Sequence, residues 1–387
     1  MKRPLLNRRL DGLGTSIFAE MSARAVATGA VNLGQGFPDV DGPPEIAAVA
    51  ATAVLTGKGN QYPPGPGIPE LRKAVAGHQR RFYGLTYDPD TEVLITAGAT
   101  EAIAAALLAL LEPGDEVIAF EPYYDSYAAN IAMAGATRVP VTLRAPAFRP
   151  DLQKLREAIT DKTRLILLNS PHNPTGMVLT RAETQAIADL ATAHDLLVVT
   201  DEVYEHLVYD RAHIPLASLP GMRERTVSVS SAGKAFSFTG WKVGWVTGTP
   251  EIVNAVRTTK QFLTFVSSGP FQYAVADALA LPDAYFATLA EDLKKKRDLF
   301  AAGLAEIGFQ VYQPDGTYFI TTDAAPLGAT DGIEFCLSLP ERAGVVAIPS
   351  AVFYDDREAG RTQVRFAFCK RTEILEEALS RLAVLAR

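Results

Sequence analysis

Short apolar runs alternate with helical patterns over the first two-thirds of the chain. We predict strands in these runs, at residues 92–96, 116–120, 137–143, 164–169, 196–200 and 226–230. Between them the apolar residues have helical spacing, as in 181–194. Strands that are apolar on both faces and alternate with helices are typical of a parallel sheet covered on both sides. We therefore predict an α/β fold with a mostly parallel sheet between helices.

The pattern changes after Gly244, where helical stretches are followed by short strand-like segments. We predict helices at 250–257, 274–281 and 282–304, and strands at 309–312, 317–321, 345–348 and 363–368. A short helix is also expected at 17–21, with Thr15 or Ser16 as its N-cap. A chain of 387 residues exceeds the usual size of one domain. The predicted domains are a large one at 44–280 and a smaller α+β one formed by 1–43 and 281–387.

The composition is ordinary for a globular protein, with 48% hydrophobic and 21% charged residues. A formal net charge of −7 argues against a general affinity for nucleic acid or an anionic membrane. The longest apolar run, 102–111, is about half as long as the roughly 20 residues of a membrane-spanning helix. Residues 1–9 lack the apolar core of a secretory signal, and Cys336 and Cys369 lie in apolar segments. We expect a soluble, cytoplasmic protein with free thiols.

Three of the predicted strands end close to polar residues, at Asn169, Thr200 and Ser230. These positions are roughly 30 residues apart, which is the length of one strand–helix–strand unit. In open α/β sheets, ligands bind outside the carboxyl ends of the strands. We therefore expect the polar residues that follow these strands to meet in one crevice.

Lys234 follows the last of these strands, in a segment of small, hydroxyl-bearing and glycine residues. A lysine just past a buried strand is partly desolvated, which lowers its pKa and frees the amine as a nucleophile. Such an amine is suited to forming a Schiff base with an aldehyde or ketone. Most lysines are solvated surface charges, so this interpretation depends on the residues upstream.

The upstream residues fit an aldehyde cofactor that carries a phosphate and acts as an electron sink. Asp201 is placed to keep a pyridine nitrogen protonated, although an Asp after a strand is also a common helix N-cap. Tyr204 and Asn173 are candidates to hydrogen-bond the phenolate oxygen of the ring. Tyr124 is a candidate to stack on the ring face.

The phosphate of such a cofactor needs N–H groups at a helix start, hydroxyls and a cation. Ala99 and Thr100 follow a predicted strand and begin a helix, so their N–H groups are available. Ser231 offers a hydroxyl and Lys242 a positive charge. These four residues are the predicted phosphate site.

Three further features are candidates for contacts with a substrate or a partner. Arg365 lies in an alternating strand and fits a bidentate clamp on a carboxylate, but the sequence alone favours an exposed arginine on an edge strand. Gly34 and Gly36 allow the backbone to approach a ligand closely, or simply form a turn. The proline- and glycine-rich loop 60–67 holds Tyr62, and rigid exposed loops often belong to an interface or a site.

Other chemistries fit the sequence less well. The histidines are His78, His172, His194, His206 and His213. They show no metal-ligand spacing, so we expect each at the surface or at a helix cap and predict no metal. Gly233 and Lys234 lack the flanking residues of a phosphate loop, and no Gly-x-Ser-x-Gly elbow is present. Gly12 and Gly14 lack the third glycine and the preceding strand of a dinucleotide site.

Three motifs, in their order and spacing, resemble those of class I and II aminotransferases of PLP fold type I. They are NSPHNPTG at 169–176, DEVY at 201–204 and SAGKAFSFTGWKVGW at 231–245. Segments 32–39, 240–242 and 364–370 look most like the kynurenine aminotransferase and cysteine-conjugate β-lyase branch, and 60–67, 98–102 and 201–207 like N-succinyldiaminopimelate aminotransferases. Most class I members carry Arg where Lys242 stands, so the charge is kept and the bidentate fork is lost.

The resemblance implies pyridoxal 5'-phosphate as cofactor and a homodimer in which Tyr62 reaches the cofactor phosphate of the partner subunit. It implies that Gly36, Asn173 and Arg365 hold the substrate's α-carboxylate, and that Phe18 and Tyr124 line the side-chain pocket. Lys234 would bind the cofactor and then move the proton as general base and acid.

The function implied is the transfer of an amino group between an L-amino acid and a 2-oxo acid, with glutamate and 2-oxoglutarate as one pair. The resemblance favours N-succinyl-LL-diaminopimelate as a substrate. The alternative is a kynurenine/glutamine-type or methionine/aromatic aminotransferase with cysteine-S-conjugate β-lyase activity. The sequence leaves this open because both reactions need Lys234, Asp201 and Arg365. A cofactor-binding regulator is disfavoured because every catalytic position is filled.

Overall fold

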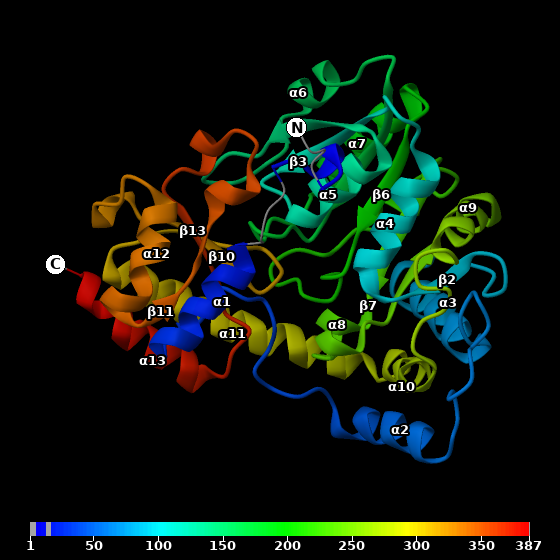
Figure 1. Cartoon of the computed structure of the whole chain (residues 1–387), viewed down its shortest axis with the longest axis horizontal. Coiled ribbons are helices and arrows are strands. Elements are labelled where there is room, and N and C mark those ends of the chain that lie inside the picture. The colour runs from blue at the N-terminus through cyan, green and yellow to red at the C-terminus, as the bar shows by residue number, and fades with distance from the viewer. Residues whose placement is uncertain (1–4, 13–16, 387) are drawn as a thin grey trace.

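The computed structural model describes residues 5–12 and 17–386 (Figure 1). The predicted N-cap residues, Thr15 and Ser16, lie outside the described residues. In the described part of the chain, no helix is both long and apolar enough to cross a membrane.

A seven-stranded sheet forms the centre of the larger part of the molecule, in the order β2-β8-β7-β6-β5-β3-β4. Its strands are β2 (Val93–Thr96), β3 (Glu116–Glu121), β4 (Thr137–Thr142), β5 (Thr163–Asn169), β6 (Leu197–Asp201), β7 (Thr226–Ser231) and β8 (Gly244–Thr247). Neighbouring strands pair in parallel except for β8, which is antiparallel to both β2 and β7. The prediction of a mostly parallel sheet is therefore confirmed, and all of its predicted strands are present.

The strand β8 is an addition to the predicted sheet. It has four residues, begins with Gly244 and directly follows the segment that holds Lys234. The sequence therefore contains no long apolar run that predicts this strand. A Cβ on Gly244 would lie 2.6 Å from the carbonyl carbon of Gly98 and 2.8 Å from the nitrogen of Ala99. Glycine is needed here because the strand passes directly against the start of the helix that begins at Gly98.

Helices cover both faces of this sheet, and the apolar strand residues divide between them. The helices are α2 (Pro44–Leu55), α3 (Pro69–Tyr83), α4 (Gly98–Leu110), α5 (Asp125–Ala134), α6 (Leu152–Glu157), α7 (Arg181–Ala193), α8 (Ala232–Ala235), α9 (Pro250–Lys260) and α10 (Gly269–Leu279). Leu165, Val199 and Val227 pack with α4, α5 and α9 on one face. Ile166 and Val198 pack with α7 on the other, where α2, α3 and α10 cover the β2–β8 end.

A second, four-stranded antiparallel sheet lies beside the first, in the order β12-β13-β10-β9. The elements of this part are α1 (Ile17–Thr28), β1 (Val31–Asn32), α11 (Asp283–Ile307), β9 (Gln310–Tyr312), β10 (Phe319–Asp323), α12 (Gly332–Ala343), β11 (Val345–Val346), β12 (Ile348–Pro349), β13 (Gln363–Ala367) and α13 (Thr372–Leu382). Strand β1 pairs in parallel with β11, and α1 packs on α12, so the N-terminal segment lies against the C-terminal part. The domain bounds at 43/44 and 280/281 stay a prediction.

Several element boundaries differ from the predicted ones, and two of these differences have an identifiable reason. Helix α10 begins at Gly269 instead of residue 274, because Pro270 occupies its first turn, where a missing N–H costs nothing. Helix α11 continues to Ile307 and ends at Gly308, whose φ of 115° suits only glycine.

Candidate active site

A cavity of about 580 Å³ opens at the carboxyl ends of β5, β6 and β7, next to the start of α4. All of the predicted site residues except Tyr62 line it. They are Phe18, Gly36, Ala99, Thr100, Tyr124, Asn173, Asp201, Tyr204, Ser231, Lys234, Lys242 and Arg365. The cavity is thus lined by Arg365 of the C-terminal sheet and by residues at or just after the ends of strands of the central sheet. The predicted crevice exists at the predicted edge.

Asp201 is the last residue of β6, and its carboxylate is buried. Its Oδ2 accepts a hydrogen bond of 2.5 Å from the hydroxyl of Tyr127, and its Oδ1 accepts one of 3.3 Å from the N–H of Val203. Burial raises the pKa of Asp201, while these two hydrogen bonds and the charge of Lys234 oppose that effect. No helix begins directly after Asp201, so the alternative of a helix N-cap is wrong.

Asn169 ties the end of β5 to the other elements of the pocket floor. Its Nδ2 donates to the carbonyl oxygen of Asp201 at 2.8 Å. Its Oδ1 accepts from the N–H of Asn173 at 2.7 Å. The first residues of the loop that carries Asn173 are therefore fixed relative to Asp201.

Lys234 lies in α8, immediately after β7, and is partly buried. Its Nζ is 3.4 Å from the carbonyl oxygen of Gly36, and 5.8 and 5.7 Å from the ring centres of Tyr204 and Tyr318. Burial lowers the pKa of Lys234 to about 8, even though Asp201 acts in the opposite direction. At neutral pH, which lies about one unit below this pKa, a minority of the amine is in the neutral form that a nucleophile requires, far more than for an ordinary lysine.

The start of α4 and the end of η3 (Thr239–Trp241) form the predicted phosphate end. Ala99 and Thr100 are in the first turn of α4, where N–H groups have no intrahelical partner. Lys242 has a left-handed φ of 54°, and its Nζ is 3.1 Å from the place that a Cβ on Gly98 would occupy. Ser231, at the end of β7, is buried beside them. The arrangement puts hydroxyl, ammonium and free N–H groups along one wall.

Arg365 lies in β13, between β12 and β10, and is only 1% exposed. The interpretation as a surface arginine on an edge strand is therefore wrong. Its terminal nitrogens donate to Asn173 Oδ1 and to the carbonyl oxygen of Gly34, both at 2.9 Å, and its Nε has no partner. The guanidinium is 4.0 Å from the ring centre of Phe319. Burial lowers the pKa of Arg365 to about 10.

Gly36 is fixed by its neighbours as closely as any residue of the pocket. A Cβ there would lie 2.3 Å from the ring of Phe319. Its carbonyl oxygen accepts a hydrogen bond of 2.6 Å from the hydroxyl of Tyr318. The sequence predicts that another group comes close to the backbone at Gly36. In the structure this group is the side chain of Phe319, which leaves no room for a Cβ.

Tyr62 does not reach the pocket of its own chain. Its side chain is 81% exposed, and its ring packs edge-on against Phe265 at 5.3 Å between ring centres. The predicted contact of Tyr62 with a cofactor phosphate therefore needs a second copy of the chain.

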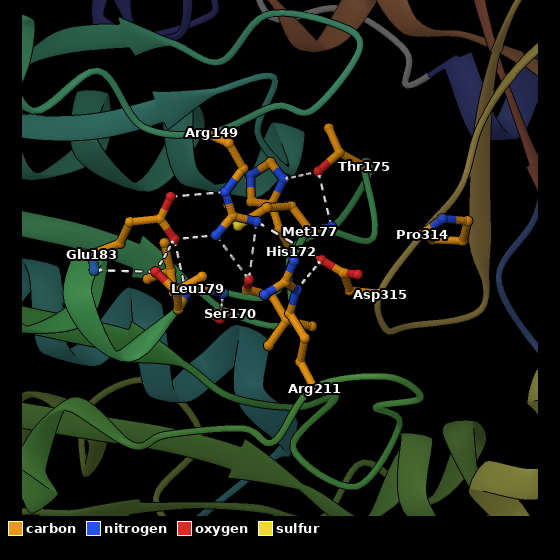
Figure 2. Close-up of polar contacts among 12 residues, drawn as sticks. Arg149, Ser170, His172, Thr175, Met177, Leu179, Glu183, Arg211, Pro314 and Asp315 are labelled. Carbon is orange, nitrogen blue, oxygen red and sulfur yellow. Dashed lines mark hydrogen bonds and ion pairs between the residues drawn. The ribbon is translucent and has the colours of Figure 1, made fainter.

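A polar network around Arg149 anchors the loop between β5 and α7, which also carries Asn173 (Figure 2). Arg149 donates from Nε to Glu183 Oε1 at 2.7 Å, and both terminal nitrogens donate to the carbonyl oxygen of Val178 at 3.1 Å. The same loop binds the C-terminal part, because Asp315 donates its N–H to the carbonyl oxygen of Gly176 at 2.9 Å. These contacts hold the later residues of the loop, at Gly176 and Val178.

Sequence reasoning did not single out several residues that shape the site: Gly34 as an acceptor for Arg365, Tyr127, Asn169 as a bridge, Tyr318 and Phe319. A signal existed for Tyr127, because it follows Tyr124 by one helical turn and so shares its face of α5. Nothing in the sequence pairs Gly34 with Arg365, which is 331 residues away.

The mostly parallel sheet, the lysine after β7 and the buried carboxylate at the end of β6 define a fold type I aminotransferase. Residues 28–382 match the family described as Aminotransferase class I and II, and the chain belongs to that family. Its members use pyridoxal phosphate. The predicted family is confirmed, and the chain is a transaminase.

Three relatives illustrate the range of named activities. A probable N-succinyldiaminopimelate aminotransferase of Mycobacterium tuberculosis is 54% identical over 98% of both chains. A methionine aminotransferase of Escherichia coli is 40% identical over 97% of both, and a kynurenine–oxoglutarate transaminase of Rattus norvegicus is 37% identical over 96% of this chain and 88% of its own. The solved structure of the N-succinyldiaminopimelate aminotransferase from Mycobacterium tuberculosis superposes with a TM-score of 0.96, covering 98% of this chain and all of that one.

Proposed function

We propose that this chain binds pyridoxal 5'-phosphate in the cavity and uses it to move an amino group between an L-amino acid and a 2-oxo acid, with glutamate and 2-oxoglutarate as one pair. The observation that carries the proposal is that the cavity wall holds positive charges without carboxylate partners. Arg365 and Lys242 line it, and neither forms an ion pair with any carboxylate in the described residues. Arg365 is buried, and a buried cation without an anion is costly unless a ligand supplies the anion; Lys242 is exposed and adds a second positive charge to the same wall. A cofactor phosphate and a substrate carboxylate match them.

The polar groups of the cavity offer partners for the ring atoms of the cofactor. Asp201 offers a buried carboxylate for the ring nitrogen, held in place by Tyr127. Asn173 has its Oδ1 occupied by Arg365, which leaves its amide N–H groups to donate to the ring oxygen together with Tyr204. When bound, the cofactor supplies an aldehyde for Lys234 and a ring that accepts electrons.

The phosphate and ring contacts follow from the same wall. The first turn of α4 supplies N–H groups from Ala99 and Thr100, with the positive end of the helix dipole. Ser231 and Lys242 complete the site with a hydroxyl and a charge. Tyr124 is the side chain placed to cover a ring face.

The proton transfer belongs to Lys234. Its lowered pKa, near 8, gives an amine that is a competent base close to neutral pH and whose conjugate acid returns the proton readily. Arg365 and Gly36 orient the substrate carboxylate, so that the α-carbon stays within reach of the amine. Phe18 lines the cavity beside Arg365 and fits the substrate side chain.

Replacing Lys234 by Ala tests the proposal. We expect transamination to fall by roughly 10³-fold or more, since the variant lacks both the nucleophile and the base. The visible absorbance of the bound cofactor should change with it. Lys295→Ala is the matched control, because Lys295 is exposed on α11 and pairs only with Glu291. Full turnover by the Lys234 variant would disprove the assignment.

For the amino acid, we propose N-succinyl-LL-diaminopimelate, supported by the 54% identity to a relative of that name. A second candidate, an aromatic or methionine-type substrate, is favoured by the cavity itself. Phe18, Phe37 and Tyr124 line it, and its cationic side chains among the described residues are Lys234, Lys242 and Arg365. Neither Arg24 nor Lys260 lines the cavity, so neither is available there as the partner of a second carboxylate.

The positions of these two residues explain why they are unavailable. Arg24 pairs with Glu20 of its own helix at 3.5 Å and donates to the carbonyl oxygen of Leu337 in α12, also at 3.5 Å. Lys260 is 1% exposed and donates to the carbonyl oxygen of Phe265 at 3.0 Å. A second substrate carboxylate would have to find its donors in neutral groups or in a partner subunit.

A panel of donors assayed with 2-oxoglutarate separates these candidates. A kcat/KM at least tenfold higher for N-succinyl-LL-diaminopimelate than for methionine, phenylalanine, kynurenine or glutamine would support the first. The reverse order would support the second. Release of pyruvate and ammonia from a cysteine S-conjugate, measured beside amino transfer, reports the β-lyase alternative.

We also propose a homodimer whose subunits share active sites. The exposed apolar side chains of Phe262 (82%), Phe265 (56%) and Leu263 (46%) lie together in sequence, and Tyr62 packs on Phe265. Exposed apolar patches of this kind mark interfaces. Sedimentation should give twice the chain mass, and Tyr62→Phe should weaken cofactor binding without dissociating the dimer. A cytoplasmic location stays a prediction.

A further inference from the structure

Two histidines, one in α3 and one in the segment that follows β6, form a pair outside the active-site cavity. His78 of α3 and His206 have their Nε2 atoms 2.7 Å apart. Glu205 completes the group, since one ligand atom from each of the three residues lies within 4.8 Å of the others. The prediction that each histidine sits at the surface or at a cap is wrong for His78 and His172, which are buried, and for His213, whose side chain is 3% exposed; His194 does cap α7.

Two polar atoms of this group lack partners. Glu205 is 5% exposed; its Oε1 accepts from the hydroxyl of Ser230 at 2.5 Å, and its Oε2 is buried without a partner. His78 is 2% exposed, and its Nδ1 is also buried without a partner. An unpartnered carboxylate oxygen at such depth is rare unless a ligand or an ion completes it, and Oε2 of Glu205 is the atom that an ion bound to the two Nε2 atoms would complete.

We propose that His78, Glu205 and His206 bind a divalent transition metal ion of the Zn²⁺ type. Two imidazoles and one carboxylate are a common protein ligand set for Zn²⁺, with water in the fourth position. On one tetrahedral ion, with Zn–N distances of about 2.0–2.1 Å, the two nitrogens would be roughly 3.3 Å apart. The rings therefore separate by a few tenths of an ångström, and metal coordination replaces their mutual hydrogen bond.

The surroundings agree with such a site. The ring of His206 packs on Phe82 and Phe286, at 4.7 and 4.1 Å between ring centres. His206 itself is only partly buried, which provides the entry path.

The proton balance of binding is simple. In the neutral pair one ring donates through its Nε2–H to the other. For both Nε2 atoms to bind the ion, that proton moves to the Nδ1 of the same ring, and no net proton is released. Glu205 binds as the carboxylate. The ion would join α3 to the segment that holds Tyr204 and, through Glu205, to Ser230 at the end of β7.

The test uses the complete cofactor-loaded enzyme, freed of metals with a chelator and titrated with Zn²⁺ by calorimetry. We expect one Zn²⁺ per chain and a higher Tm with Zn²⁺ than without. His206→Asn and Glu205→Gln should each weaken Zn²⁺ affinity by at least about tenfold. His194→Asn is the control, because this exposed histidine at the end of α7 should leave the affinity unchanged.

Using two variants guards against one that fails to fold, and each is first checked for a normal melting transition without metal. Absence of Zn²⁺ binding to the wild-type enzyme would overturn the proposal. So would equal affinity in wild type and both variants, which would leave a hydrogen-bonded histidine pair alone. Neither result depends on the identity of the amino acid substrate.

Discussion

Arg149 and Arg365 hold the same loop from opposite ends, in opposite electrostatic settings. Arg149 binds the carbonyl oxygen of Val178 and is neutralised by the carboxylate of Glu183, with Asp315 at 3.8 Å (Figure 2). Arg365 binds Asn173, yet no carboxylate of the described residues pairs with it. It is also the more deeply buried of the two.

The difference distinguishes a structural charge from a functional one. A buried cation that meets its anion within the fold stabilises the fold and is available to nothing else. A buried cation without an anion carries a desolvation cost that only a ligand offsets. Arg365 fits the second description, so its role is recognition, and the neighbouring paired network supplies the rigidity that recognition needs.

The largest expected effect is the loss of catalytic efficiency when Arg365, the functional charge, is replaced. Arg365→Met should lower kcat/KM by roughly 10²–10⁴-fold, from two charge-assisted hydrogen bonds of about 1.5–3 kcal/mol each. The stability of the cofactor-free protein should stay within about 1 kcal/mol, since an unpaired buried charge is removed. Kinetics with the preferred donor and urea unfolding check both values. Arg164→Met, at an exposed position of β5, is the control.

Replacing Arg149, the structural charge, should instead lower the stability of the fold. Arg149→Met leaves Glu183 half-buried without its cation and Val178 without a donor, which should cost about 2–3 kcal/mol. Among molecules that remain folded, kcat/KM should fall less than tenfold. Unfolding and steady-state kinetics on the same preparation measure the two quantities. A variant as stable as wild type but inactive would erase the distinction between the two arginines.

A third prediction concerns pH and Lys234. Its pKa of about 8 in the fold lies below the usual 10.5, so the folded state bears the cost of a buried ammonium below pH 8. Between pH 8 and 10.5 the folded state has lost this proton and the unfolded state still holds it, so stability relative to Lys234→Met rises with pH. In the cofactor-free protein, Lys234→Met should therefore be more stable at pH 7 by about 1–3 kcal/mol. That advantage should shrink towards pH 10.5; a constant difference would contradict the lowered pKa.

The smallest effect is expected at Lys242. Lys242→Arg keeps the charge of the proposed phosphate site, so the cofactor dissociation constant should change by less than about threefold. Lys242→Met removes the charge and should weaken binding more strongly, by roughly tenfold. Titration of the cofactor-free enzyme, followed by absorbance, gives both constants. Equal constants for Lys and Met would move Lys242 out of the phosphate site.

The sequence by itself determined the central sheet and one side of the pocket. Strands buried on both faces are apolar throughout, so their positions are a local property of the chain. The carboxyl ends of parallel strands share one edge, so Asn173, Asp201 and Lys234 meet wherever those strands pair in this way. This is why chain order and spacing sufficed to bring them together.

Only the tertiary structure determined the side of the pocket that holds Arg365. The alternation around Arg365 is the same for an edge strand and a central one, and β10 and β12 on either side of β13 make it central. The hydroxyl of Tyr127 and the pairing of His78 with His206 likewise depend on which segment packs over which. Burial, and with it the state of a charge, is a property of contacts between residues far apart in the chain, and short-range patterns do not encode those contacts.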